Sequence, residues 1–146
     1  MRIYFDNCCL NRPYDDLKDK AVRMECEAIL SIIDYCGSGE WSYFSSDVLL
    51  DEILAMVDYE KQEKVLLLYH SAGEHIAFTE GIYMRAKELE KQNIKSYDAL
   101  HIASAETAMA DVFLTTDRKL INAAQRINLG IPIMNPLLWL TEVLYD

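Results

Sequence analysis

The sequence has few residues that interrupt regular structure. Its 146 residues include only 5 Gly and 3 Pro, and no stretch rich in glycine, proline and serine divides the chain. It also lacks the ~18-residue apolar run of a membrane span and the basic-then-apolar start of a signal peptide. We therefore expect one domain over residues 1–146, acting in the cytoplasm and without membrane contact.

Other absences exclude whole classes of chemistry. Only 14 Lys+Arg stand against 24 Asp+Glu, and the net charge of −10 excludes a generally basic, DNA-coating protein. No GxxxxGK[ST] or GxGxxG motif is present, which disfavours nucleotide-driven chemistry. The 4 cysteines form no CxxC pair, and the 3 histidines are not spaced as zinc ligands. The 51% of hydrophobic residues, in turn, is too high for a disordered chain.

What the chain does have is an alternation of short apolar runs and longer amphipathic stretches. The short runs are typical of buried parallel strands and comprise residues 3–5, 41–44, 75–78, 112–114 and 132–134. The longer stretches have helical spacing and comprise residues 18–36, 47–56, 59–72, 80–92, 96–109 and 118–128, with Pro136 opening a last helix. The pattern predicts an α/β fold, a three-layer α/β/α sandwich around a parallel sheet of four or five strands. Residues 7–13 are expected to form a loop.

Carboxylates follow two of the predicted strands. Asp6 comes directly after the run 3–5, and Thr115, Thr116 and Asp117 follow the run 112–114. In open parallel sheets, ligands bind beyond the carboxyl ends of the strands, near a switch in strand order. Taken singly, each aspartate is more often a cap of the next helix or loop than a ligand.

Two further acids lie on the apolar faces of predicted helices. Glu52 has apolar neighbours three and four residues away on both sides, and Asp98 shares its face with His101 and Ile102. An isolated buried carboxylate is costly unless it is paired, hydrogen-bonded or bound to a metal. Each of the two could be a hydrogen-bonded structural acid.

The four acids matter as a set. If Asp6, Glu52, Asp98 and Asp117 converge, they cannot all stay ionised without a counter-charge. No lysine or arginine is placed by sequence to neutralise them, and oxygen ligands select a hard cation, Mg²⁺ or Mn²⁺. Such a cluster is suited to metal-assisted hydrolysis of phosphodiester bonds.

These residues, in this order, resemble the PIN domain family, and most closely its small bacterial VapC-like ribonucleases. The resemblance spans essentially the whole chain. It consists of the strand ending in Asp6, the Val48–Ile53 segment with Glu52, the Asp98–Ala103 helix start and the strand end Leu114–Asp117. Asn7 stands where this family commonly has Thr or Ser.

The resemblance implies a three-layer fold and a metal-dependent endoribonuclease. It implies Asp6, Glu52, Asp98 and Asp117 as catalytic, metal-binding acids, and Thr115 as a hydroxyl that positions a metal-bound water. Asn7 is an auxiliary residue that could hydrogen-bond a ligand or water. Many such proteins are homodimers, and many are toxins held inactive by a small antitoxin encoded beside them.

Several neighbours of the predicted site have two interpretations. Arg12, Arg118 and Lys119 could contact RNA phosphates, or could form surface ion pairs. His101, one turn after Asp98, could support the acids or carry a proton, or could be a buried histidine satisfied by hydrogen bonds. Because the chain is acidic overall, we expect RNA binding to be weak, sensitive to salt and dependent on metal.

Two other functions are open to the sequence. The first is a catalytically inactive PIN-like module that acts through protein contacts. The second is a phospho-acceptor receiver domain, which is disfavoured because Ile133–Pro136 lacks the lysine that such a domain needs after its last strand.

Overall fold

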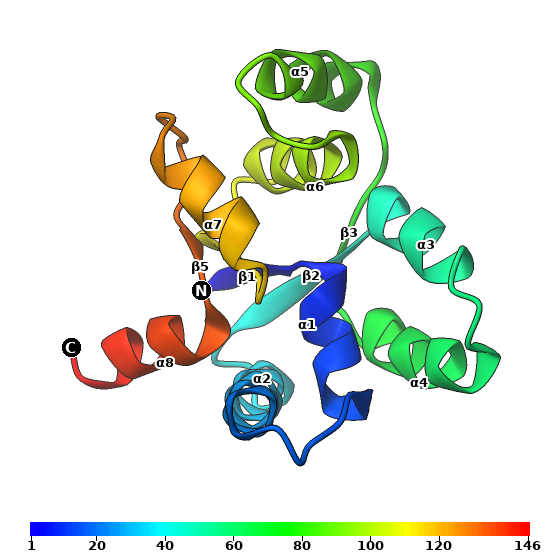
Figure 1. The fold of residues 1–146 in the computed structure, drawn as a ribbon, viewed down its shortest axis with the longest axis vertical. Coiled ribbons are helices and arrows are strands. Elements are labelled where there is room, and N and C mark those ends of the chain that lie inside the picture. The colour runs from blue at the N-terminus through cyan, green and yellow to red at the C-terminus, as the bar shows by residue number, and fades with distance from the viewer.

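A five-stranded parallel sheet forms the centre of the molecule. In a computed structural model that describes all residues from Met1 to Asp146, the strands have the order β3-β2-β1-β4-β5 (Figure 1). All neighbouring pairs are parallel. The strands are β1 (Arg2–Phe5), β2 (Ser42–Ser46), β3 (Glu74–Ile76), β4 (Val112–Leu114) and β5 (Ile133–Met134). The expected α/β sandwich is confirmed, with five strands.

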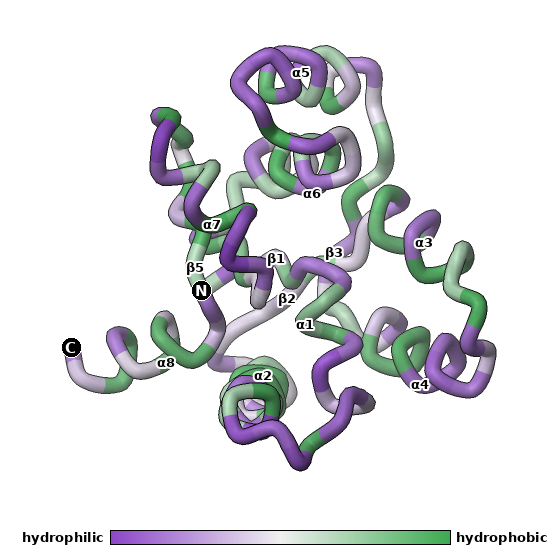
Figure 2. Tube along the Cα trace, viewed as in Figure 1, coloured by the Kyte–Doolittle hydropathy of each residue, from purple (hydrophilic) through white to green (hydrophobic).

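Helices connect the strands and cover both faces of the sheet. They are α1 (Asn7–Asn11), α2 (Lys20–Gly37), α3 (Asp47–Leu54), α4 (Tyr59–His70), α5 (Glu80–Glu90), α6 (Ser96–Thr107), α7 (Arg118–Gln125) and α8 (Pro136–Leu144). Hydrophobic and hydrophilic stretches alternate along them, as expected of amphipathic helices on a sheet (Figure 2). None of the helices is long and apolar enough to cross a membrane.

The central strand divides the core into two parts. Ile3 and Phe5 of β1 belong to a cluster with residues of α2, α3, α4 and α8, whereas Tyr4 belongs to a second cluster with residues of α5, α6 and α7. Successive side chains of a strand point to opposite faces, so this short apolar run serves both sides of the sheet. All three side chains are completely buried.

The segment after β1 is helical, which corrects the loop expected over residues 7–13. Asp6 caps α1 by accepting a hydrogen bond from the Asn7 backbone N–H, and a 3₁₀ turn over Arg12–Tyr14 follows. The five-residue α1 buries Cys9 and Leu10. It is too short to show a helical period, and its asparagines and cysteines are weak helix formers.

The packing of α3 generates a stability prediction. Leu49→Ala should lower the free energy of unfolding by about 2–5 kcal/mol, because Leu49 is completely buried in the first cluster. Leu54→Ala is the matched control, since Leu54 ends the same helix but is 57% exposed, and its effect should stay within about 0.5 kcal/mol. Urea denaturation measures both, and equal losses would contradict this assignment of the core.

Candidate metal centre

The predicted acids surround the carboxyl end of β1. From β1 the chain moves to β2 on one side of the sheet, and β4 is added later on the other side. The gap between the ends of β1 and β4 is therefore a switch point in strand order, where open α/β sheets bind ligands. Asp6 follows β1, and Thr115 follows β4.

Asp6 is fixed from both sides of this gap. Its Oδ1 accepts a hydrogen bond from the Asn7 N–H at 2.8 Å, and its Oδ2 accepts one from Thr115 Oγ1, also at 2.8 Å. Thr115 in turn accepts a hydrogen bond from the Asp117 N–H at 3.1 Å. Asp6 is only 7% exposed. In this arrangement the Thr115 hydroxyl orients Asp6, instead of pointing at open solvent.

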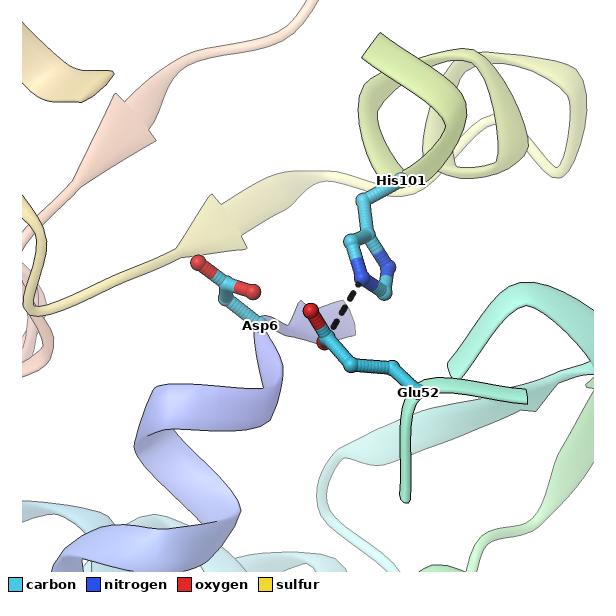
Figure 3. A group of neighbouring side chains, drawn as sticks. All are labelled: Asp6, Glu52 and His101. Atoms are coloured by element: carbon cyan, nitrogen blue, oxygen red, sulfur yellow. Dashed lines mark hydrogen bonds and ion pairs between the residues drawn. The ribbon is translucent and has the colours of Figure 1, made fainter. Parts of the chain in front are cut away.

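Glu52 reaches Asp6 from α3, the helix that follows β2. Carboxylate oxygens of Asp6 and Glu52 and a ring nitrogen of His101 all lie within 4.8 Å of one another, although the three residues are far apart in the sequence (Figure 3). The Glu52 side chain is half-buried, at 31% exposure, and its Oε1 lies 3.1 Å from His101 Nε2. The expectation that Glu52 faces inward is confirmed.

Asp98 lies in the first turn of α6 and Asp117 caps α7. The two residues line one cavity of about 170 Å³ together with Lys95 and Lys119. Burial, and after it the negative charges of Asp6 and Asp117, raise the pKa of Asp98 to about 6. Asp117 is exposed, and its Oδ1 accepts hydrogen bonds from the backbone of Lys119 and Leu120. Asp117 thus acts as a helix cap and also contributes to the charge around Asp98.

The carboxylates have almost no counter-charge. No lysine or arginine forms an ion pair with Asp6, Glu52, Asp98 or Asp117, and the one basic side chain in contact with the group is His101, which is hydrogen-bonded to Glu52. Burial and the neighbouring negative charges together disfavour the ionised form of Asp98, whose pKa is raised to about 6. An oxygen-rich, uncompensated site of this kind is suited to a hard divalent cation.

The predicted phosphate-binding arginines differ in their surroundings. Arg12 is held in ion pairs with Asp15 at 2.9 Å and Glu25 at 3.0 Å, which matches the surface ion pair considered from the sequence. Arg118 is exposed and lines a cavity of about 360 Å³ between α2, α7 and α8. Asn7 is half-buried, and its Oδ1 accepts a hydrogen bond from Asn11.

Some residues around the acids were not indicated by the sequence. Tyr4 and Ser46 contact one another at the base of the site, and Tyr4 also contacts His101. The sequence does not mark Tyr4 as a site residue, because Tyr4 lies in a short apolar run that is typical of the buried core. Lys95 stands at the start of α6 without a pattern that would mark it.

A family model establishes the relationship of the chain. The PIN domain model matches residues 18–126, which is more than half of the sequence. The chain belongs to the PIN domain family. The matched residues include Glu52, Asp98 and Asp117, while Asp6 precedes them.

Solved structures agree with this PIN fold. VapBC2 from Rickettsia felis, bound to a DNA fragment from their promoter, is 16% identical, with 92% of this chain and 98% of that chain covered at a TM-score of 0.64. FitAcB from Neisseria gonorrhoeae is 14% identical (92% and 97% covered, TM-score 0.59). VapBC-1 from nontypeable Haemophilus influenzae is 16% identical (93% and 98% covered, TM-score 0.57). No curated protein sequence matches the chain. At such identities the likeness establishes the fold.

The burial of Asp98 and the negative charges around it generate a pH-dependent prediction. A carboxyl whose pKa is raised on folding loses stability as the pH rises from its unfolded value of 3.8 through its folded value of about 6. In EDTA at pH 7.5, Asp98→Asn should therefore raise the free energy of unfolding by about 1–2 kcal/mol, a range that allows for solvent screening.

The wild-type protein and Asp98→Asn, compared at lower pH, provide the control. Because both forms of residue 98 are neutral in the folded state at low pH, the advantage of Asp98→Asn should shrink as the pH falls from 6 toward 4. Urea denaturation at several pH values measures this. A stability gain of Asp98→Asn that is independent of pH, or a destabilised variant at pH 7.5, would contradict the raised pKa of Asp98.

Proposed function

We propose that this PIN protein is a metal-dependent endoribonuclease. The observation that carries the proposal is the group of uncompensated carboxylates at the switch point of the sheet, with Asp6, Glu52 and His101 within 4.8 Å and the pKa of Asp98 raised to about 6. The family membership and the order of the acids along the chain support it. Hydrolysis of RNA phosphodiester bonds is the reaction that such a site suits best.

In this proposal each site residue has a defined task. Asp6, Glu52, Asp98 and Asp117 would hold Mg²⁺ or Mn²⁺, which supplies an activated water and stabilises negative charge on the phosphate. Thr115 and the Asn7 N–H keep Asp6 oriented toward the site. These hydrogen bonds hold the Asp6 carboxylate in one orientation.

Lysines at the rim suit a polyanionic substrate. Lys95 and Lys119 line the cavity that contains Asp98 and Asp117, and both residues are exposed. They could neutralise phosphates on either side of the bond that is cleaved. Since the net charge is −10, few other cations are available, and we expect RNA affinity to fall steeply with salt.

We further propose that the protein is the toxin of a toxin–antitoxin pair and forms a homodimer. The VapC-like order of the acids supports this role. Two of the similar structures are VapBC structures and a third is FitAcB, and more than nine-tenths of this chain is covered in each comparison. A small antitoxin is then the expected protein partner.

The nuclease proposal predicts the effect of neutralising the site. Asp6→Asn should reduce Mn²⁺-dependent cleavage of a labelled RNA by at least about 100-fold, because it removes a charge that the ion requires. Excess EDTA should abolish cleavage by the wild-type protein. Gel analysis of the RNA fragments measures both effects.

Asp34→Asn is the matched control, since it makes the same change at an exposed position on α2. It should leave the rate within about twofold. Cleavage that continues unchanged in EDTA would overturn the metal-dependent mechanism. An intact protein that binds Mn²⁺ but cleaves neither RNA nor DNA would favour the protein-interaction module instead.

A further inference from the structure

A line of buried hydrogen bonds runs from the start of α3 to the Glu52 carboxylate. Ser46 Oγ lies 2.8 Å from Tyr4 Oη, Tyr4 Oη lies 2.7 Å from His101 Nδ1, and His101 Nε2 lies 3.1 Å from Glu52 Oε1. Ser46, Tyr4 and His101 are each completely buried. Groups so deeply buried are held in one arrangement by their few available partners.

The donors and acceptors in this line have one consistent arrangement around Glu52. An ionised carboxylate can only accept, so Nε2 of His101 must carry the hydrogen that lies between them. In the neutral imidazole, Nδ1 then accepts from the Tyr4 hydroxyl, and Tyr4 accepts from Ser46. Burial raises the pKa of Tyr4 well above its usual range, so its hydroxyl keeps its proton.

Both ends of this line of hydrogen bonds belong to α3: one is its capping residue and the other is a side chain further along the helix. Ser46 is the N-cap of this helix, because its Oγ accepts the Leu49 N–H at 3.0 Å. Glu52 lies further along the same helix and receives the other end of the line. The beginning of α3 and its functional side chain are therefore both tied to β1 and α6, which fixes where Glu52 can point.

We propose that His101 is a positioning residue that holds Glu52 in place for a metal ion and does not itself bind the ion. This rests on the proposed function of the acidic site. Nδ1 of His101 is turned toward Tyr4 in the core, and Nε2 is occupied by Glu52. One Glu52 oxygen is thereby engaged, and its carboxylate is ordered before any ion arrives. A preordered ligand loses less conformational freedom on binding.

The test is the Mn²⁺ affinity of the full-length protein, measured by titration calorimetry without any substrate. His101→Leu cannot donate to Glu52 and should weaken binding about 10- to 100-fold. His101→Gln should restore most of the affinity, because a glutamine amide N–H can occupy the place of Nε2–H. Tyr4→Phe, which removes only the hydroxyl, should cause a smaller loss in the same direction.

Tyr43→Phe is the matched control for Tyr4→Phe. Tyr43 is also a buried strand tyrosine, but its hydroxyl donates to the Leu68 carbonyl at 2.5 Å, away from the acids. Tyr43→Phe should leave the Mn²⁺ affinity unchanged, even if it alters the stability of the protein. Should His101→Leu fail to fold, the difference between Tyr4→Phe and Tyr43→Phe still decides the question.

A spectroscopic measurement separates positioning from direct ligation. With ¹⁵N-labelled histidine, electron spin-echo modulation of bound Mn²⁺ should show no directly bonded nitrogen, and such a coupling would overturn the proposal. Unchanged affinity in both His101→Leu and Tyr4→Phe would overturn it as well, while leaving the nuclease proposal intact. A wild-type protein that binds no Mn²⁺ would overturn both.

Discussion

The burial of several carboxylates close to one another at one edge of the sheet is the constraint on which the site depends. The strand order leaves a switch point beside the end of β1, and the acids around it are Asp6 directly after β1, Glu52 of α3, Asp98 of α6 and Asp117 at the start of α7. No lysine or arginine forms an ion pair with these acids, and burial together with the neighbouring charges raises the pKa of Asp98 to about 6. The fold therefore maintains an arrangement that costs stability in the absence of a cation, as functional sites often do.

Most of the fold could be predicted from the sequence because its signals are local. Each strand is a short apolar run, and most helices are bounded by capping side chains, as Ser46, Thr79 and Asn135 illustrate. The predicted helix over residues 96–109 is observed over Ser96–Thr107, and the strand 112–114 is observed unchanged. α1 was missed because its formation depends on the Asp6 cap and on burial of Cys9 and Leu10, which are tertiary effects.

The acids of the site were also predictable, whereas the groups that hold them were not. Glu52 and Asp98 stand out as charged residues among apolar helical neighbours, and Asp6 follows an apolar run. Their catalytic roles remain a prediction. The supporting contacts join distant parts of the chain, such as Tyr4 with His101, and no sequence spacing reveals them. For the same reason, the sequence left open whether Arg12 meets phosphate or the acids that now surround it.

The most direct test of this account is a crystal structure of the protein grown with Mn²⁺, with the ion located by its anomalous scattering. We expect a peak bonded to carboxylate oxygens of the acidic cluster, with Asp6 and Glu52 among its ligands and no histidine nitrogen. An empty cluster at saturating Mn²⁺, or an ion bound only elsewhere on the surface, would contradict it.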